Sequence, residues 1–550
     1  MRENCGRSLQ NVKGKRECKM IAKLSLYANT IKAMRASQIY YRIRKMLKLD
    51  CSIGCTVSSN TGRVEPIATV SELDFDLSFL KRFSADEILA DKITFLHTSK
   101  DFHWNQRWHF DDKSALWNFN LHYFEFLFSL VDAYEKTADR KYLDKSVETI
   151  NCWIDRNPQK SGGEGWASYT IALRLTNWLS YYSYVNEELD ISFKEKLLGS
   201  IHEQYEFLSR HLEKDILGNH YFEDLKALIL CALFFGDTNV LEKALKAFHQ
   251  ECREEILPDG MHFELSPMYH KLIFEGVIRV AAALRAGGRA DSEIEQYLQP
   301  MLNVAWSLEE GLERVPLFND CGNNVAKSLP AVMASCKKHF GISPVFKACL
   351  EDSGYYIFKQ GDWKLIVDAG QPGPTYIPGH AHCDAGSFEL FKEGKPVIVN
   401  CGTYAYQCKE RGFFRSTTAH NTVMVNDTEQ SQCWGTFRMA RRSKTVVNSI
   451  DDAGISMTIT DQKGRMVTRV IRLTEKKLII EDQAVGRKLC SYIHMESNAD
   501  FNKLCASNAG EKIEGRRTMS PYAVDYGAQK DINMITYEAK NDITVSFDLK

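Results

Sequence analysis

Residues 354–370 read GYYIFKQGDWKLIVDAG, two runs of strand-forming residues separated by a Gly-Asp pair that is typical of a turn. Short segments of the same kind continue to the end of the chain. They are FELFKEGKPVIVNCG, NTVMVND, SKTVVNSIDDAGISMTITD, MVTRVIRLTEKKLIIEDQA and ITVSFDLK. EGK at 393–395 and EKK at 475–477 have the composition of hairpin loops. Residues 350–550 are therefore predicted to form an antiparallel β-sandwich.

Upstream of this half, from residue 85 to 340, the apolar residues recur at helical spacing. The segment RKYLDKSVETINCWIDRN keeps Tyr142, Val147, Ile150 and Trp153 on one stripe. Similar segments of 15 to 20 residues follow, separated by turn signals such as Gly236-Asp237 and Gly287-Gly288. Successive antiparallel helices predict an α/α array. The sequence period alone does not choose between an open solenoid and a curved toroid.

Residues 1–84 form a third region, an N-terminal extension with one basic amphipathic helix, ASQIYYRIRKMLKL (36–49). Such a helix can bind a membrane surface. Its Tyr40, Tyr41, Ile43 and Met46 favour the other interpretation, that the helix docks on the body of the protein.

The overall composition is that of an ordinary protein of two or three domains, with 44% hydrophobic and 26% charged residues among 550. A formal net charge of −1 gives no global argument for nucleic acid or membrane as a partner. Neither a signal peptide nor an apolar run of the roughly 20 residues needed to span a bilayer is visible. We therefore expect a cytoplasmic protein whose sixteen cysteines are mostly reduced and buried.

Two polar motifs interrupt the helical half. GNHYFED (218–224) places Asn219, His220 and Glu223 at a predicted helix start, although Asn219 can also be a simple helix cap. PDGMHFELSPMYHK (258–271) places Tyr269 in the first turn of a helix that Pro267 begins. Glu264 in this motif has the features of a solvated surface carboxylate.

The strand half opens with GHAHCDAGSFEL (379–390), in which His380, His382 and Asp384 alternate. On a strand, alternate residues share a face, so these side chains would converge on one target. His420 precedes a further strand, and Arg411 and Arg415 lie just before it. Three histidines from adjacent strands could bind a metal ion.

The series GNHYFED, ELSPMYH, GHAHCDAGSFEL, NCGTYAY and FRSTTAHNTV resembles the heparinase II/III-type polysaccharide lyases, in order and in separation. WNFNLHYFEFL (117–127) and SYTIALRLTNW (168–178) are also similar to the helical domain of that family. The resemblance implies an (α/α) toroid, an incomplete helical barrel, followed by an antiparallel β-sandwich, with the active site between them. It also implies cleavage of an acidic, uronic-acid-containing polysaccharide by β-elimination.

The resemblance assigns a role to each residue of the motifs. Elimination needs a group that neutralises the uronate carboxylate, a base for the C5 proton and an acid for the leaving O4. Asn219 matches the group that neutralises the carboxylate, and His220 and Glu223 lie beside it in the motif. Tyr269 matches the acid. His380 matches a base. Arg411 and Arg415 would bind substrate or lower the pKa of Tyr269, so that this tyrosine could also act as a base.

A structural divalent metal, zinc or calcium, is the cofactor that the resemblance implies. His382 and His420 match two of its ligands. At the position of the third, an aspartate in the family, this chain has Asn400, and a neutral amide is a weaker zinc ligand than a carboxylate. The metal is therefore either weakly held, absent, or completed by Asp384.

Two other classes of function stay open on the sequence. A glycoside hydrolase on the same architecture would need two carboxylates about 5 to 9 Å apart, which Glu223, Asp259 and Glu264 do not obviously supply. A non-catalytic protein of glycan binding or polysaccharide assembly would keep the cleft without the chemistry.

Overall fold

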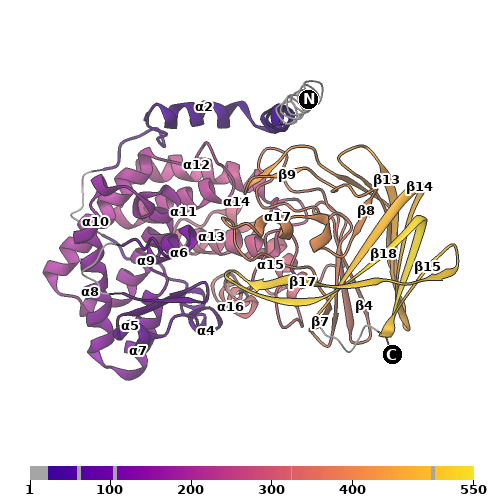
Figure 1. Ribbon diagram of the computed structural model, residues 1–550. Coiled ribbons are helices and arrows are strands. Elements are labelled where there is room, and N and C mark those ends of the chain that lie inside the picture. The colour runs from indigo at the N-terminus through magenta and orange to yellow at the C-terminus, as the bar shows by residue number, and fades with distance from the viewer. Residues whose placement is uncertain (1–22, 59–63, 103–107, 324, 497–501, 550) are drawn as a thin grey trace, which may run out of the picture.

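The computed structural model describes residues 23–58, 64–102, 108–323, 325–496 and 502–549 in two halves that lie side by side (Figure 1). Helices form the first half and β-strands the second. The predicted N-terminal extension includes residues 1–22, which lie outside the described residues. The prediction of an incomplete (α/α) toroid followed by an antiparallel β-sandwich is confirmed.

The toroid is held together by one continuous apolar core. α11 (Asn219–Phe235) is buried around nearly its whole circumference, whereas α8 (Arg140–Arg156) buries a single stripe and covers the outside. The other helices of this half are α3 (Ser71–Asp74), α4 (Leu77–Leu80), α5 (Ala85–Leu89), α6 (Ala115–Leu121), α7 (Leu127–Thr137), α9 (Ser168–Val185), α10 (Ile191–Arg210), α12 (Thr238–Glu255), α13 (Pro267–Ala286), α14 (Ser292–Glu295), α15 (Leu298–Glu309) and α16 (Leu329–Phe340).

Two features of this half differ from the sequence prediction. The apolar core includes Val57, Leu73 and Phe79, so it extends upstream of the predicted boundary at residue 85. A hairpin of β1 (Lys92–Phe95) and β2 (Thr98–Asp101) also interrupts the helices. Its strands are too short to give a clear alternating pattern, which is why the sequence did not reveal them.

The sandwich is one hydrogen-bonded sheet of 14 strands among the described residues, folded over a second apolar core. The long antiparallel pair β14 (Lys477–Met495) and β18 (Ala528–Asp548) links its layers. The remaining strands are β3 (Cys349–Leu350), β4 (Tyr355–Gln360), β5 (Trp363–Asp368), β6 (Phe388–Lys392), β7 (Lys395–Ile398), β8 (Val423–Val425), β11 (Lys444–Asp451), β12 (Gly454–Thr460), β13 (Met466–Leu473), β15 (Leu504–Asn508), β16 (Glu511–Ile513) and β17 (Arg516–Asp525). A separate short pair, β9 (Cys433–Trp434) and β10 (Arg438–Met439), lies at the edge facing the toroid.

The hairpin predicted at 393–395 is confirmed by the antiparallel pair β6 and β7. The strand predicted for His380, His382 and Asp384 is wrong, because β6 begins only at Phe388 and the three residues lie in a loop. The carbonyl of Ala381 accepts hydrogen bonds from Arg415 instead of from a neighbouring strand. The alternation of these three polar residues therefore did not indicate a β-strand.

A connecting segment between α15 and α16 joins the two halves. Arg314 of this segment forms a two-pronged ion pair with Glu389 of β6, at 3.1 and 3.0 Å. Glu389 also accepts hydrogen bonds from the backbone N–H groups of Leu317 and Asn400, at 3.0 and 2.9 Å. Both side chains of the ion pair are buried, so one carboxylate organises the junction between toroid and sandwich.

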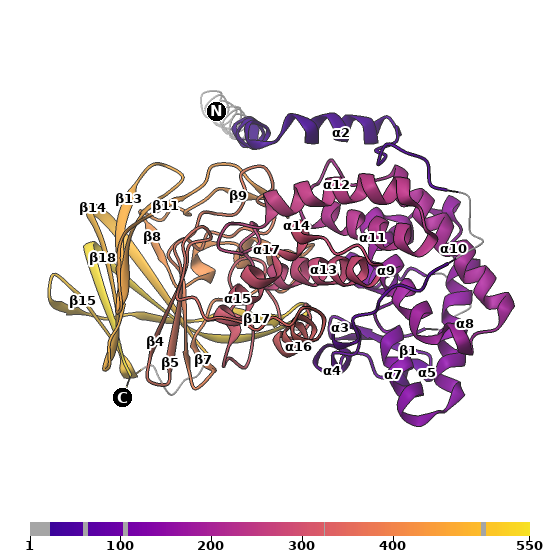
Figure 2. The same ribbon diagram turned by 180° about the vertical axis from the view of Figure 1, so that it is seen from behind.

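α2 (Ala36–Met46) and the helical residues 23–33 before it run along one edge of the molecule, above the toroid and toward β9 (Figures 1 and 2). The helix docks on the protein as predicted, and Tyr41 is half-buried with the Lys214 ammonium 5.4 Å from its ring. The predicted contacts of Tyr40, Ile43 and Met46 are wrong, because these side chains are 54%, 52% and 78% exposed. The buried residue of α2 is Gln38, whose amide donates to the carbonyl of Ile216. No helix among the described residues is long and apolar enough to cross a bilayer.

The Arg314–Glu389 pair generates a stability prediction. Replacing Glu389 by alanine leaves the Arg314 guanidinium buried without its counterion, which is expected to lower the free energy of unfolding by about 3–5 kcal/mol. Urea unfolding followed by tryptophan fluorescence measures the change. Glu310→Ala is the matched control, because the Glu310–Lys359 pair is solvent-exposed and its loss is expected to lower the free energy by about 0–1 kcal/mol. Equal effects of the two substitutions would contradict the role given to Glu389.

Candidate active site

A cleft of about 890 Å³ lies between toroid and sandwich, with the N-terminal helices contributing one wall. Five of the residues selected from the sequence line it, and they come from both halves of the chain. They are Asn219, His220, Glu223, Tyr269 and His380. The structure therefore brings together residues that are separated by more than a hundred positions in the sequence.

The start of α11 forms the toroid side of the cleft. Gly218 precedes it with φ of +59°, and a Cβ there would lie 2.9 Å from Ile377 and 3.2 Å from Glu264, so only glycine fits. This turn places Asn219 as the first helical residue. The Nδ1 atom of His220 lies 2.8 Å from Glu213 rather than near Glu223.

Glu223 is buried one turn further along α11 and pairs with Lys226. Burial raises the pKa of Glu223, and the Lys226 ammonium opposes that shift. The pair adds polar groups to the cleft wall with little net charge.

Tyr269 sits in the first turn of α13, where the Ser266 side chain caps the helix by accepting from the Tyr269 N–H. Its hydroxyl is 2.7 Å from that of Tyr406, which is 2.8 Å from that of Tyr526. Burial, with Tyr406 as a further cause, holds the pKa of Tyr269 well above its usual value. The expected lowering of this pKa by Arg411 or Arg415 is therefore wrong, and the Tyr269 hydroxyl is protonated at neutral pH.

Asp320 is the centre of the site, and the sequence did not reveal it. Its carboxylate lies 2.9 Å from Nδ1 of His380 and 2.9 Å from Nε2 of His382, and it accepts two hydrogen bonds from Arg411. Burial alone would raise the pKa of Asp320, but Arg411 and the two imidazoles hold it well below its usual range. A permanently ionised carboxylate therefore lies beneath both histidines.

Asn319, the residue before Asp320, fixes the same segment to both of its neighbours. Its side chain donates to the carbonyl of Leu265, at 3.0 Å, and accepts from the N–H of His382, at 3.1 Å. Its φ of +57° is a conformation that asparagine tolerates better than most residues. A polar Asn-Asp pair directly after the apolar run Pro-Leu-Phe (316–318) was the available signal in the sequence.

The bond to Asp320 determines the tautomer of His380. An ionised carboxylate only accepts, so Nδ1 of His380 must carry the proton. In the neutral ring, Nε2 is then the unprotonated nitrogen. The imidazole ring lies 4.0 Å from the ring of Tyr269, centroid to centroid. A proton acceptor and a proton donor thus lie next to each other in one cleft.

The two arginines predicted to bind substrate lie behind the cleft wall. Arg411 is 3% exposed and engaged by Asp320. Arg415 is 1% exposed and donates to the carbonyls of Pro378 and Ala381 in the histidine loop. Neither lines the cleft, so the prediction of substrate contact is corrected to one of positioning the loop and Asp320.

The expectation that Glu264 is a surface carboxylate is also wrong, because the residue is 1% exposed and lines the cleft. Neither of its carboxyl oxygens has a hydrogen-bond partner among the described residues. Nδ1 of His262 lies 4.0 Å from its carboxylate, beyond hydrogen-bonding distance. Burial raises the pKa of Glu264 to about 7; His380 opposes the shift, while Glu255 and Asp320 add to it.

Behind the histidine loop, His382, Asp384 and His420 form a buried group whose ligand atoms lie within 4.8 Å of one another. Nδ1 of His382 is 3.3 Å from Nε2 of His420. When two imidazole nitrogens bind the same tetrahedral zinc ion, they lie about 3.3 Å from each other. The spacing between His382 and His420 therefore fits zinc. Burial lowers the pKa of His382 to about 4, which keeps the ring in the neutral, metal-binding form.

The side chain of Asn400, predicted as a metal ligand, has other partners. Its oxygen accepts from the N–H of Asn421 at 3.0 Å, and its amide nitrogen lies 3.5 Å from the Ser387 hydroxyl. Asp384 is therefore a better candidate than Asn400 for the third metal ligand in this chain.

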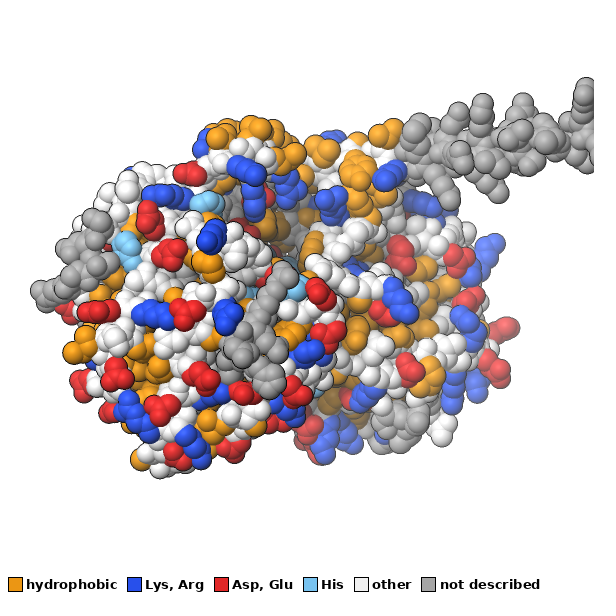
Figure 3. Space-filling view, turned by 60° about the vertical axis from the view of Figure 1, so that its left-hand side comes forward, with side chains coloured by type: hydrophobic (Ala, Val, Ile, Leu, Met, Phe, Trp, Pro, Cys, Tyr) orange, Lys and Arg blue, Asp and Glu red, His pale blue; other side chains and the backbone are white. Residues whose placement is uncertain are grey.

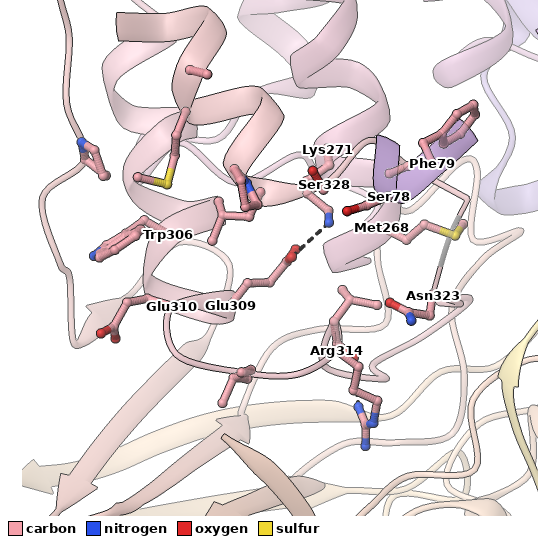
Figure 4. Close-up of a pocket in the computed structure, with 18 of the residues that line it drawn as sticks. Ser78, Phe79, Met268, Lys271, Trp306, Glu309, Glu310, Arg314, Asn323 and Ser328 are labelled. Carbon is pink, nitrogen blue, oxygen red and sulfur yellow. Dashed lines mark hydrogen bonds and ion pairs between the residues drawn. The ribbon is translucent and has the colours of Figure 1, made fainter. Parts of the chain in front are cut away.

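A second cavity of about 860 Å³ lies between α13, α15, α16 and the connecting segment (Figure 4). Lys271 and Glu309 form an ion pair in it, 2.8 Å apart. None of the residues selected from the sequence lines this cavity. The chemistry is concentrated in the first cleft.

The chain matches two family descriptions. Residues 18–347 match the heparinase II/III N-terminus, and residues 347–512 match the heparinase II/III-like C-terminal domain. Among solved structures, a heparinase III superimposes with a TM-score of 0.69 at 17% identity, covering 90% of this chain and 87% of that one. A heparan sulfate lyase mutant from Pedobacter heparinus gives 0.56 at 18% identity, with 93% and 87% covered. At these identities the likeness establishes the fold.

Relatives found by sequence share somewhat higher identity with this chain. A heparin-sulfate lyase from Pedobacter heparinus is 24% identical over 445 residues, which cover 73% of this chain and 65% of the relative. A heparin-sulfate lyase from Bacteroides thetaiotaomicron is 20% identical over 492 residues, covering 78% and 68%. The chain thus spans about two thirds of the length of these relatives. Because the two family matches together cover most of its residues, the chain belongs to the heparinase II/III family.

Proposed function

We propose that this protein is a polysaccharide lyase that cleaves a uronic-acid-containing glycan by β-elimination. The main support is the pairing of His380, held by Asp320 with Nε2 unprotonated, with the protonated hydroxyl of Tyr269. Relatives named as heparin-sulfate lyases add support for an acidic polysaccharide as the substrate class.

The reaction starts at the uronate carboxylate. Asn219 donates a hydrogen bond to it, which stabilises the negative charge that develops when C5 loses its proton. Nε2 of His380 removes that proton, and the resulting imidazolium is stabilised by Asp320. The electron pair of the C5–H bond then forms the C4–C5 double bond as the C4–O4 bond breaks.

Tyr269 completes the reaction by giving its proton to the departing O4. Its raised pKa favours this direction of transfer, and Tyr406 can hydrogen-bond to the phenolate that remains. His220 and the Glu223–Lys226 pair line the toroid wall of the same cleft, and in this proposal they bind sugar hydroxyls. Asp320 is fully buried, and the other residues of this mechanism line one cleft.

The first prediction concerns Tyr269. Tyr269→Phe removes the proton donor and leaves the ring packing unchanged, so turnover is expected to fall by roughly 10²- to 10⁴-fold. The assay is the rise in absorbance near 232 nm, the known signal of the unsaturated uronate, on a panel of uronate polysaccharides. Tyr492→Phe is the matched control, because within the described part of the chain the Tyr492 hydroxyl contacts only the Met424 sulfur, at 3.7 Å. Near-wild-type turnover of Tyr269→Phe would contradict the assigned role.

The same panel separates the other classes of function. New reducing ends without the absorbance would identify a glycoside hydrolase. Binding without either product would identify a glycan-binding or polysaccharide-assembly protein.

Glu264 generates a prediction about pH. Above its pKa of about 7 an unpaired carboxylate faces the cleft and repels a uronate, so the KM for an acidic substrate is expected to rise with pH. A single ionisation of this kind raises KM by roughly fivefold between pH 7 and pH 8. Glu264→Gln keeps the shape of the side chain without its charge, so the rise of KM with pH that is due to Glu264 is expected to disappear. An identical pH dependence of KM in both proteins would contradict this account.

We also propose that His382, Asp384 and His420 hold a structural divalent metal, zinc in preference to calcium because two ligands are imidazoles. The bond from Nε2 of His382 to Asp320 would orient the ring for binding through Nδ1. When bound, the metal supplies rigidity to the loop that carries His380 and takes no part in proton transfer.

The metal proposal predicts the zinc content of the purified protein. Protein purified without chelator is expected to contain about one equivalent of zinc by mass spectrometry, and His420→Ala is expected to lose it. A chelator is expected to lower the stability of the wild type by about 3 kcal/mol if zinc stood at a hundred times its dissociation constant. Asn400→Gln is the comparison variant, and it is expected to retain zinc. Retention of zinc in His420→Ala, or its absence from the wild type after growth in zinc, would contradict the site.

A further inference from the structure

The N-terminal helices contact both halves of the protein through their polar groups. Arg35 donates to Glu254 of α12 at 2.9 Å, and Gln38 donates to the carbonyl of Ile216. At the other end, the Thr30 hydroxyl accepts from the Trp434 indole at 3.0 Å, and the Tyr27 ring packs edge-on against the same indole. These contacts hold the segment across one side of the cleft.

The apolar face of α2 points the other way. Ile39, Tyr40, Ile43, Met46 and Leu47 are 38%, 54%, 52%, 78% and 65% exposed. Their spacing places them on one helical stripe, opposite Gln38. An ordinary surface helix buries its apolar stripe and exposes its polar face, and α2 does the reverse.

The helix before α2 repeats this arrangement. Leu24 and Ile31 are 60% and 54% exposed, and they lie seven residues, or two helical turns, apart. Figure 3 shows hydrophobic side chains with Lys and Arg beside them along the upper edge of the molecule, where α2 lies in Figure 1. A grouped exposed apolar surface of this kind indicates an interaction site.

The charge of the segment indicates what the surface binds. Residues 23–48 contain seven Lys or Arg and no Asp or Glu, although the whole chain has a net charge of −1. These basic residues are Lys23, Lys32, Arg35, Arg42, Arg44, Lys45 and Lys48. Arg35 pairs with Glu254, and Arg42 and Lys45 pair with Asp215, all on the side of the protein. The positive charge available to an outside partner therefore comes from the other four. Residues 1–22 add six more basic residues against two acidic ones. An apolar stripe flanked only by positive charge is complementary to an anionic lipid surface.

We propose that the outward face of residues 24–47 docks on an anionic membrane surface, with its apolar side chains at headgroup depth and Lys32 and Arg44, together with the flanking Lys23 and Lys48, against the lipid phosphates. The polar contacts to Glu254, Ile216 and Trp434 stay intact in this arrangement, because they lie on the opposite side of the helices. The cleft, which Thr30, Met34 and Arg42 also line, is then held close to the lipid surface. This inference does not depend on the proposed lyase activity.

The test is co-sedimentation of the full-length protein with vesicles of phosphatidylcholine alone or of phosphatidylcholine with phosphatidylglycerol. Binding to the anionic vesicles is expected to be at least roughly tenfold tighter and to weaken with added salt. The double variant Ile43→Asp and Met46→Asp places charge on the apolar stripe and is expected to bind at least roughly tenfold more weakly. Val485→Asp is the matched control, because Val485 is 94% exposed on the sandwich, and it is expected to bind like the wild type.

Other outcomes would overturn the proposal. Equal binding to both kinds of vesicle, no binding to either, or undiminished binding of the double variant would each do so. Light scattering provides a separate check: a concentration-dependent dimer that the double variant abolishes would show that a second copy of the chain covers the face instead. Circular dichroism of the double variant verifies that its helices are retained.

Discussion

The buried carboxylate of Asp320 is the constraint on which the site depends. It belongs to neither the core of the toroid nor a strand of the sandwich, but to the segment between α15 and α16, which contacts both halves. Removed from water, an ionised carboxylate needs several donors, and it takes them from His380, His382 and Arg411. Satisfying this one charge fixes the register of the histidine loop against the rest of the protein.

The two histidines of the loop acquire different roles through that carboxylate. Asp320 holds His380 by Nδ1 and His382 by Nε2, so the free nitrogens of the two rings are different atoms. The free nitrogen of His380 belongs to the cleft, and that of His382 lies toward His420. On one strand face the two imidazoles would point the same way. Here they point to different sites, because Asp320 holds one ring by Nδ1 and the other by Nε2.

Much of the architecture was predictable because periodicity is local. The change of period near residue 350 separated the two halves, and the polar motifs at Asn219, Tyr269 and His380 indicated residues that meet in one cleft. Asp320 was not predictable, because its role depends on contacts across 60 and 91 positions and on no pattern in its neighbours. The direction of the apolar stripe of α2 was equally hidden, since an amphipathic pattern gives two faces without stating which one meets the protein.

The three tyrosine hydroxyls have a consequence for how such a protein can evolve. Tyr269 comes from the toroid, whereas Tyr406 and Tyr526 come from the sandwich half of the chain. Neither half contains the whole hydrogen-bonded chain, so recombination that exchanged one half for that of a distant relative would break it unless the matching tyrosines arrived together. Exchange of either half therefore preserves the hydrogen-bonded chain only when the tyrosines of the new half match those of the other.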